Sequence, residues 1–218
     1  MRMRRKPWAR PELAECPFFI DTPIENRGKW ADAFQNKTDL HVELGCGKGS
    51  FVSATALKNP NINYLAIDIK SEVLAVGRRT IVKQFEASKR EIINILLTAF
   101  DIERVDEILS KEDNIKRFYI NFCNPWPKGK HQKRRLTFPR QLNKYREFLA
   151  DGGEIRFKTD DLPLFIDSLD YFAECGFDVI YKTNDLHKSD VSDNIMTEHE
   201  IMFSNEGIPI NYCIAVKR

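Results

Sequence analysis

Short apolar runs alternate with longer stretches of mixed polarity along the chain from residue 39 onward. The runs are rich in β-branched and aromatic residues, which is typical of buried strands. The stretches between them carry apolar residues at the three- and four-residue spacing of helices that pack one face on a sheet. The pattern predicts strands at residues 40–44, 63–69, 92–97, 117–122, 154–158, 179–182 and 210–216, and helices at residues 50–58, 72–85, 101–109, 138–149 and 162–175.

The alternation of strands and helices predicts an α/β fold of the Rossmann-like kind, a mostly parallel seven-stranded sheet with helices on both faces. The chain has 218 residues, enough for one sizeable core, so residues 29–218 are expected to form a single domain. Such a sheet binds ligands beyond the carboxyl ends of its strands. One crevice should therefore collect the residues at those ends: 43–49, Asp68, Asp101, 123–126 and 158–161.

Two segments lie outside this pattern. Residues 1–28 combine four prolines with scattered aromatic residues and are predicted to form an irregular basic arm that orders on binding. The basic residues near its start are Arg2, Arg4, Arg5, Lys6 and Arg10. Residues 183–194 are polar and are expected to form a mobile loop. The segment that follows the loop has two interpretations, a surface strand or a lid over the crevice.

Composition limits the class of protein. The hydrophobic fraction of 42% and the charged fraction of 30% are typical of a soluble globular chain. The 34 basic and 32 acidic side chains leave a formal charge of +2, so an anionic partner must be bound by local patches. The chain shows neither the apolar core of a signal peptide nor a run that could span a bilayer. These features predict a cytoplasmic protein that does not associate with a membrane.

Cysteine and histidine usage argues against disulfides and metal sites. The five cysteines are odd in number and include no C-x-x-C pair, which predicts reduced thiols and no zinc site. His41 and His131 lack neighbours at the spacing of metal ligands, so no metal is expected. Cys123 follows a predicted strand and could be a nucleophile, but a small buried thiol is the simpler interpretation.

A rigid turn and a cluster of positive charge follow the strand at residues 117–122. Asn124-Pro125-Trp126-Pro127 ends the strand, and the two prolines hold Asn124 and Trp126 in defined directions. The next eight residues include Lys128, Lys130, His131, Gln132, Lys133, Arg134 and Arg135. A charge run is usually a solvated face. Directly behind a stiff turn, it is better interpreted as a loop that binds phosphate groups. Trp126 either stacks on a base or packs the turn.

Acidic residues and glycines mark the ends of the first three predicted strands. Glu43 precedes a turn with glycines at every second position, but Ser50 stands where a dinucleotide fingerprint has its third glycine. This spacing favours a loop that lies against a nucleoside or amino-acid moiety. Asp68 ends the next strand, where a carboxylate can accept both ribose hydroxyls. Asp101 ends the third strand and could face an adenine amine or serve as a helix N-cap.

Six segments together resemble a known family, and they cover nearly the whole chain. They are residues 2–8 (RMRRKPW), 43–49 (ELGCGKG), 121–127 (NFCNPWP), 131–136 (HQKRRL), 157–160 (FKTD) and 197–200 (TEHE). In this combination the chain resembles the bacterial tRNA (guanine-N7-)-methyltransferases, which have the class I methyltransferase fold and use S-adenosylmethionine. The resemblance implies methyl transfer to N7 of a guanine in the tRNA variable loop. The sequence leaves open whether the protein is a monomer or a homodimer, and no metal is expected.

The resemblance also implies roles for individual residues. The methyl-donor site would be lined by Glu43, Gly45, Gly47, Asp68, Asp101 and Asn124. The target guanine or its nucleotide would meet Lys128, Asp160, Thr197, Glu198, His199 and Glu200. The RNA backbone would be held by Lys130, His131, Gln132, Lys133, Arg134 and Arg135.

One residue departs from the family pattern. The family has Asp-Pro-Trp-Pro where this chain has Asn124, which can neither carry a charge nor act as a base. No residue is therefore assigned a catalytic role. Guanine N7 already offers an unprotonated lone pair, so alignment of donor and acceptor can carry the reaction. Asn124 is hypothesised to orient the cofactor or the base, and Asp160 or Glu200 could supply an anion near the purine as it becomes cationic.

Three other functions compete with this interpretation. Asn124-Pro125-Trp126 is similar to the Asn-Pro-Pro-aromatic motif of amino-methyltransferases, so an exocyclic amine is an alternative acceptor. A non-catalytic RNA-binding protein that retains the fold is a second alternative, with Asn124 marking lost activity. A nicotinamide oxidoreductase is the least favoured, because the third glycine of the fingerprint is missing.

Overall fold

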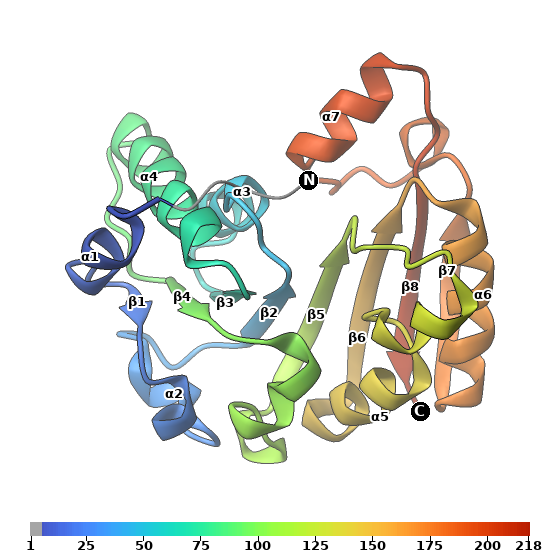
Figure 1. The fold of residues 1–218 in the computed structure, drawn as a ribbon, viewed down its shortest axis with the longest axis horizontal. Coiled ribbons are helices and arrows are strands. Elements are labelled where there is room, and N and C mark those ends of the chain that lie inside the picture. The colour runs from blue at the N-terminus through green and yellow to red at the C-terminus, as the bar shows by residue number, and fades with distance from the viewer. Residues whose placement is uncertain (1–5) are drawn as a thin grey trace.

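The computed structural model describes residues 6–218, and its centre is one eight-stranded sheet (Figure 1). The strand order is β1-β4-β3-β2-β5-β6-β8-β7. Strands β1 to β6 run parallel, and β8 is antiparallel to both β6 and β7. The strands are β1 (Phe19–Ile20), β2 (Leu40–Leu44), β3 (Asn63–Asp68), β4 (Ile95–Ala99), β5 (Ile115–Asn121), β6 (Leu149–Thr159), β7 (Phe177–Thr183) and β8 (Asn211–Lys217).

Helices cover both faces of this sheet, as the sequence predicts. They are α1 (Ala9–Ala14), α2 (Trp30–Ala33), α3 (Ser50–Lys58), α4 (Ser71–Ala87), α5 (Pro139–Phe148), α6 (Leu162–Glu174) and α7 (Glu198–Asn205). Tyr119 of β5 packs on Phe51 of α3, whereas its neighbour Phe118 packs on Tyr145 of α5. Because successive residues of a strand point to opposite faces, α3 and α5 lie on opposite sides of the sheet. The α/β fold is therefore confirmed.

The predicted strands are all present, with two differences. The sheet has eight strands rather than seven, because the two-residue strand β1 pairs with β4 along its edge. Two residues are too few to show an alternating pattern. Strand β6 begins at Leu149, directly after α5, and is longer than the segment 154–158 predicted from apolar residues alone. Its first part contains Gly152 and Gly153. Glycine has a low propensity for strands, so the sequence pattern did not predict a strand there.

The segment before residue 28 is structured, and the prediction of an irregular arm is wrong for residues 9–20. Helix α1 buries Ala9 and Leu13 in the core, and Phe18 is buried just before β1. Glu12 of α1 forms ion pairs with Arg78 and Arg79 of α4. The apolar spacing of this short helix is masked in the sequence by the prolines around it. Residues 1–5 of the predicted arm, with the basic residues Arg2, Arg4 and Arg5, lie outside the described residues.

Two predicted helix starts also differ from the structure. Residues 102–107 form a 3-10 helix rather than the α-helix expected at 101–109, and Asp101 caps it by accepting a hydrogen bond from the Glu103 N–H at 2.9 Å. Helix α4 begins at Ser71, one residue before the start expected at residue 72, and its N-cap is Lys70. Helix α6 begins at Leu162, as predicted, and Asp161 is its N-cap, since its Oδ1 accepts from the Leu164 N–H at 2.7 Å.

Between β7 and β8 the chain leaves the sheet and returns through α7. Residues 189–196, here called the strap, follow a short 3-10 helix and lead into α7. Figure 1 shows α7 standing beyond the carboxyl ends of β5 and β6, apart from the helices that cover the sheet. Residues 198–205 therefore form a helix, and the alternative of a surface strand is wrong. Within residues 6–218, no helix combines the length and apolar character needed to cross a membrane.

Candidate functional site

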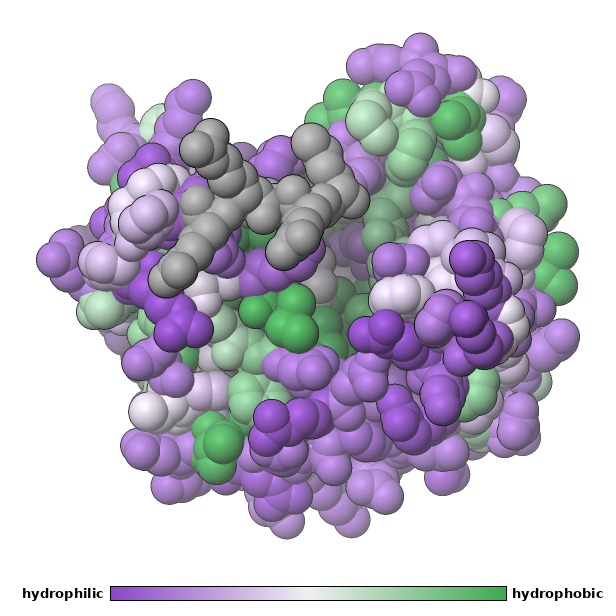
Figure 2. Space-filling view, viewed as in Figure 1, coloured by the Kyte–Doolittle hydropathy of each residue, from purple (hydrophilic) through white to green (hydrophobic). Residues whose placement is uncertain are grey.

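Two adjoining cavities lie beyond the carboxyl ends of β2, β3 and β5, and together they are called the crevice. Their volumes are about 390 and 400 Å³. The first extends from the glycine-rich turn to α7, and the second reaches the turn after β5. Figure 2 shows the surface hollowed beneath α7. Both cavities are lined by Gly45, Val73, Asn121 and Phe122, so the two form one continuous site.

Glu43 is a buried carboxylate at the bottom of the crevice. It is 3% exposed, and its Oε1 accepts a hydrogen bond from the Asn121 amide at 3.2 Å. Among residues 6–218, no group forms a hydrogen bond with its Oε2. Burial raises the pKa of Glu43 to about 8, although the Asn121 amide and the charge of Lys158 act in the opposite direction. A buried acceptor without a partner is costly, so Glu43 is suited to an N–H or O–H of a ligand.

The glycine-rich turn leaves room for a ligand at two of its three glycines. Gly45 and Gly47 have positive φ angles, and a Cβ atom at either position would meet no atom within 4 Å. A Cβ at Gly49 would instead lie 3.4 Å from Gly77 and 3.3 Å from Ile81 of α4. Gly45 and Gly47 therefore expose backbone to the crevice, whereas Gly49 allows close packing of the turn on a helix.

Asp68 lies in the crevice, and Asp101 does not line it. The Oδ2 atom of Asp68 accepts from the Gly47 N–H at 3.1 Å, and Oδ1 accepts from the Lys70 N–H at 2.9 Å. Each oxygen keeps a free lone pair, so Asp68 can still accept hydroxyl hydrogens. Burial raises the pKa of Asp68, and the two backbone N–H groups partly offset this. For Asp101 the structure shows the N-cap role, one of the two left open by the sequence.

The turn after β5 holds two bulky residues in an unusual backbone conformation. Phe122 and Trp126 have backbone φ angles of 52° and 42°, and residues other than glycine rarely adopt positive φ angles. The Oδ1 atom of Asn124 accepts from the Trp126 N–H at 3.0 Å and so closes the turn. Asn124 is exposed at the second cavity, with Trp126 beside it. The guanidinium of Arg134 lies 4.3 Å from the Trp126 ring, so Trp126 stacks with a cation within this turn.

The basic loop is a 3-10 helix, Gly129–Arg134, and its last predicted residue has a different role. Lys130, Lys133 and Arg134 are exposed, as expected for residues that bind RNA. Arg135 is 2% exposed, and it donates to the Pro125 carbonyl at 2.7 Å and to Asp167 Oδ2 at 2.6 Å. The prediction that Arg135 contacts the RNA backbone is therefore wrong, because its donors face the protein interior.

The remaining predicted residues near this loop lie at the surface. Lys128 is exposed just before the 3-10 helix, and His131 and Gln132 are half-buried within it. Asp160 is exposed but lines a separate cavity beside Lys182 and Asn184.

Burial raises the pKa of Cys123 to about 12. The Cys123 thiol therefore stays protonated near neutral pH, in agreement with the structural interpretation of this residue.

Helix α7 presents only part of the predicted 197–200 segment to the crevice. Glu198 forms an ion pair at 2.8 Å with Lys48 of the glycine-rich turn, and the His199 ring stacks on Phe122. Thr197 and Glu200 are buried and form a capping box, in which the Thr197 hydroxyl accepts from the Glu200 N–H at 3.0 Å. Glu200 therefore cannot serve as a free anion beside a purine.

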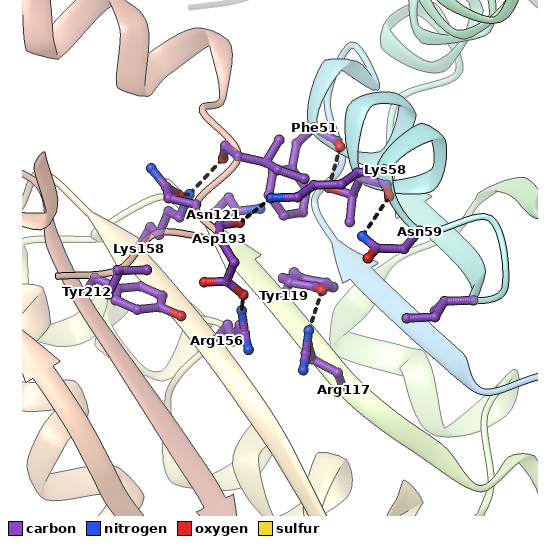
Figure 3. A pocket seen from close by; sticks show the side chains of 15 residues that line it. Phe51, Lys58, Asn59, Arg117, Tyr119, Asn121, Arg156, Lys158, Asp193 and Tyr212 are labelled. Carbon is purple, nitrogen blue, oxygen red and sulfur yellow. Dashed lines mark hydrogen bonds and ion pairs between the residues drawn. The ribbon is translucent and has the colours of Figure 1, made fainter.

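A third, smaller cavity of about 80 Å³ lies on the α3 face of the sheet (Figure 3). Figure 3 shows Lys58, Arg117, Arg156 and Lys158 around it, with Asp193 of the strap between them. Arg156 donates to Asp193 Oδ2 at 2.9 Å.

Among residues 6–218, no cluster of three or more His, Cys, Asp or Glu side chains is arranged to hold a metal ion.

Sequence reasoning missed two residues that the structure places at the crevice. Asn121 binds Glu43, and Phe122 lines both cavities of the crevice. Both belong to a segment already marked by the resemblance. The available signal was their position at the end of β5, where parallel strands expose side chains to a common site. Lys158 was expected among the strand-end residues, and the structure shows it bound to the segment that leads into α7.

Comparisons with known proteins agree with this geometry. Residues 37–213 match the family model Methyltransf_4, described as "Putative methyltransferase". A protein named tRNA (guanine-N(7)-)-methyltransferase from Clostridium perfringens (strain SM101 / Type A) is 56% identical over 218 residues, which is 100% of both chains. A protein of the same name from Acetivibrio thermocellus is 50% identical, again over 100% of both chains.

Solved structures show the same fold at low sequence identity. The 16S rRNA methyltransferase KamB has a TM-score of 0.61 and 15% identity over 82% of this chain and 87% of its own. An antibiotic-related methyltransferase has a TM-score of 0.57 and 16% identity over 100% of this chain and 96% of its own. These similarities support the class I methyltransferase fold.

Proposed function

The chain belongs to the tRNA (guanine-N(7)-)-methyltransferase family, and from this we propose that it transfers a methyl group from S-adenosylmethionine to guanine N7 in tRNA. The guanine is proposed to lie in the variable loop. The observation that carries the proposal is the crevice itself, where the open backbone of Gly45 and Gly47 lies beside the carboxylates of Glu43 and Asp68.

The residues of the crevice fit S-adenosylmethionine. Glu43 offers an unpartnered buried oxygen, Asp68 offers lone pairs suited to ribose hydroxyls, and the turn offers space at Gly45 and Gly47. Asn124 lines the far end of the crevice and completes the set proposed for the donor site. When bound, the cofactor supplies a sulfonium methyl group that is ready for transfer. Asp101 is a weaker candidate, because its side chain caps a helix.

The protein's contribution is to align the acceptor and stabilise its charge. Guanine N7 needs no deprotonation, so a general base is not required. The purine becomes cationic as the methyl group arrives, and a nearby carboxylate lowers the energy of that state. Glu198 is the carboxylate that faces the crevice from α7, whereas Glu200 is neutralised by Lys158. Glu198 and His199 are therefore proposed to act near the base. Asp160 lines a separate cavity, so its contact with the target nucleotide, like that of Lys128, is proposed on the resemblance to the family alone.

The test of this function is incubation with unmodified tRNA transcripts and methyl-labelled S-adenosylmethionine, followed by nucleoside mass spectrometry and mapping of the modified position. Labelled 7-methylguanosine in the variable loop is expected. A methylated exocyclic amine would instead identify an amino-methyltransferase. Tight tRNA binding without label in any nucleoside would identify a non-catalytic RNA-binding protein.

Replacing Asn124 with alanine should lower the single-turnover rate at least tenfold. The substitution removes the acceptor of the Trp126 N–H and with it the bond that closes the turn at the crevice. Asn124→Asp keeps an oxygen at this position and should retain the geometry. The rates are compared by rapid quench at saturating cofactor. An unchanged rate and cofactor affinity in Asn124→Ala would show that Asn124 has no role in alignment.

Removing the three exposed cations of the basic loop should weaken tRNA binding roughly a hundredfold and lower the salt dependence of binding. The triple variant Lys130→Ala, Lys133→Ala, Arg134→Ala loses up to three phosphate contacts, each worth about one unit of the slope of log affinity against log salt. Fluorescence anisotropy at several salt concentrations measures both effects. Lys182→Ala, at an exposed lysine of β7, is the matched control, and an unaltered slope in the triple variant would exclude the loop as an RNA contact.

A further inference from the structure

Lys158 lies at the end of β6, and its ammonium group is fully occupied by one segment of the chain. It is 4% exposed. Its Nζ atom donates to Asn194 Oδ1 at 2.5 Å, to the Ile195 carbonyl at 2.9 Å and to Glu200 Oε2 at 2.9 Å. A lysine ammonium has three hydrogens to donate. All three acceptors belong to residues 194–200, so no hydrogen remains for a substrate.

Glu200 is the centre of the same network on the side of α7. Its Oε2 accepts from Lys158 and lies 3.4 Å from the Thr197 N–H. Its Oε1 accepts from the Asn194 amide at 2.6 Å and lies 3.3 Å from His187 Nε2. Both oxygens are therefore bound at 0% exposure. The network joins the sheet, the strap and the first turn of α7, and the two charged side chains at its centre, Lys158 and Glu200, are buried.

The first turn of α7 depends on this network because it has little apolar packing of its own. Glu200 is its one buried side chain, and Ile201 and Met202 are 48% and 46% exposed. The other contacts of α7 include the stacking of His199 and Phe203 on Phe122, the packing of Phe203 against a small apolar cluster of Leu186, Ile210 and Tyr212, and the exposed ion pair of Glu198 with Lys48. Exposed ion pairs contribute little to stability, whereas a buried charge that loses its partner is strongly unfavourable. The Lys158–Glu200 pair is thus the buried anchor of the first turn of α7, and Phe203 packs the later part of the helix.

The position of α7 matters because the helix forms one wall of the crevice. Thr197, Glu198, His199 and Met202 line the first cavity, opposite the glycine-rich turn. Glu198 and His199 follow directly on Thr197, so their direction is set by the cap that Glu200 closes. A shift of the first turn of α7 would move both side chains away from Phe122 and Lys48.

We infer that Lys158 is a positioning residue: it holds α7 over the crevice and thereby sets Glu198 and His199 for the target nucleotide. The inference rests on the proposed function for the role of Glu198 and His199. The anchoring itself does not, since it concerns only contacts within the chain. Lys158 is not a catalytic residue in this scheme, because its three donors are already bound to the segment that it holds.

The experiment is hydrogen exchange of the full-length protein, followed by mass spectrometry, on Lys158→Met and on the control Lys182→Met. Methionine has a similar length but removes the three donors. Amides of residues 194–205 should exchange at least tenfold faster in Lys158→Met, while those of β2, β3 and β5 stay as in the parent. Lys182 is exposed on β7, and its replacement should change neither region.

Kinetics then separates positioning from a merely structural role. In Lys158→Met, kcat for methylation of saturating tRNA should fall about a hundredfold, while the affinity for S-adenosylhomocysteine changes less than fivefold. Lys158→Arg keeps a cation and should recover part of kcat. If Lys158→Met does not fold, Asn194→Ala is the second variant, because it removes one acceptor of Lys158. It should also show faster exchange of residues 194–205 and a lower kcat, with smaller changes in both.

Two results would overturn the inference. Exchange of residues 194–205 that matches the parent in both Lys158→Met and Asn194→Ala would show that Lys158 does not hold α7. A loss of kcat without faster exchange would show that Lys158 acts on the substrate directly. If the parent protein itself fails to methylate tRNA, the proposed function is wrong, but the exchange result still reports whether Lys158 anchors α7.

Discussion

Replacing Glu43 with glutamine is expected to weaken the binding of S-adenosylmethionine about a hundredfold and to remove the pH dependence of that binding. The carboxylate is buried, and one oxygen has no partner within the described chain. A hydrogen bond to a charged acceptor in such a place is worth about 1.5–3 kcal/mol, close to the 2.7 kcal/mol of a hundredfold change. Isothermal titration with cofactor or S-adenosylhomocysteine measures the loss.

The pH dependence follows from the raised pKa of Glu43. Burial brings this pKa to about 8, so the carboxyl group is largely protonated at pH 6.5 in the free protein. Binding that needs the carboxylate should therefore weaken by about tenfold for each pH unit below 8. Glu43→Gln should show a flat profile over the same range, and Glu147→Gln on the exposed side of α5 should resemble the parent. A flat profile in the parent would contradict this role for Glu43.

The same residue should make the free protein less stable as the pH rises. The pKa of Glu43 is higher in the folded chain than the ordinary value of 4.5, so the folded state holds an extra proton between about pH 4.5 and 8. Raising the pH through this window removes that proton at a cost to the folded state, and stability falls until about pH 8. Glu43→Gln should remove this decline. Over the window from pH 4.5 to pH 8, the decline in the free energy of unfolding is at most on the order of 4 kcal/mol. Urea unfolding at pH 5 and pH 8 measures the difference.

Replacing Arg135 with alanine is expected to lower the free energy of unfolding by about 2–3 kcal/mol. The buried guanidinium binds both the Pro125 carbonyl and Asp167. Asp167 is 39% exposed and can recover water, which keeps the loss below that of a fully buried pair. Because Pro125 lies in the turn that carries Asn124 and Trp126, the loss should also disturb the crevice. Chemical denaturation measures the first effect, and the single-turnover rate measures the second.

The neighbouring residue provides a matched control. Arg134→Ala removes the same kind of side chain one position earlier, but the side chain of Arg134 is 48% exposed and stacks on Trp126. Its replacement should change stability by less than about 0.5 kcal/mol and weaken tRNA binding instead. If both variants lost equal stability, or if Arg135→Ala weakened tRNA binding without loss of stability, the structural role of Arg135 would be wrong.

These two arginines show how far a charge run can be interpreted. Lys130, Lys133, Arg134 and Arg135 form one basic cluster in sequence, and nothing local separates them. The partner of Arg135 is Asp167, which lies 32 residues further along the chain on α6. Burial of a particular arginine depends on how α6 packs against the turn, so it could not be predicted from the loop alone. The same holds for the buried pair of Lys158 and Glu200. Their sequence positions are 42 residues apart, so neither residue indicates its partner locally.

The early part of the chain shows a different limit. Helix α1 and strand β1 are too short for a clear period, and the prolines around them are typical of an irregular arm. Their order comes from burial of Ala9, Leu13 and Phe18, and from the ion pairs of Glu12 with α4. Such contacts join segments more than 60 residues apart. Local propensity carries no information about them.

The sequence by itself determined the α/β class, the seven longer strands and the glycine-rich turn after Glu43, because hydrophobic period, helix caps and turn residues are local properties. It also identified the family through six motifs, three of which lie at strand ends. The tertiary structure decided which of the marked residues face the crevice. Glu43, Asp68, Glu198 and His199 do, whereas Arg135 and Glu200 are buried and paired. The physical reason is that the cost of burying a charge depends on its partners, and those partners come from distant parts of the chain.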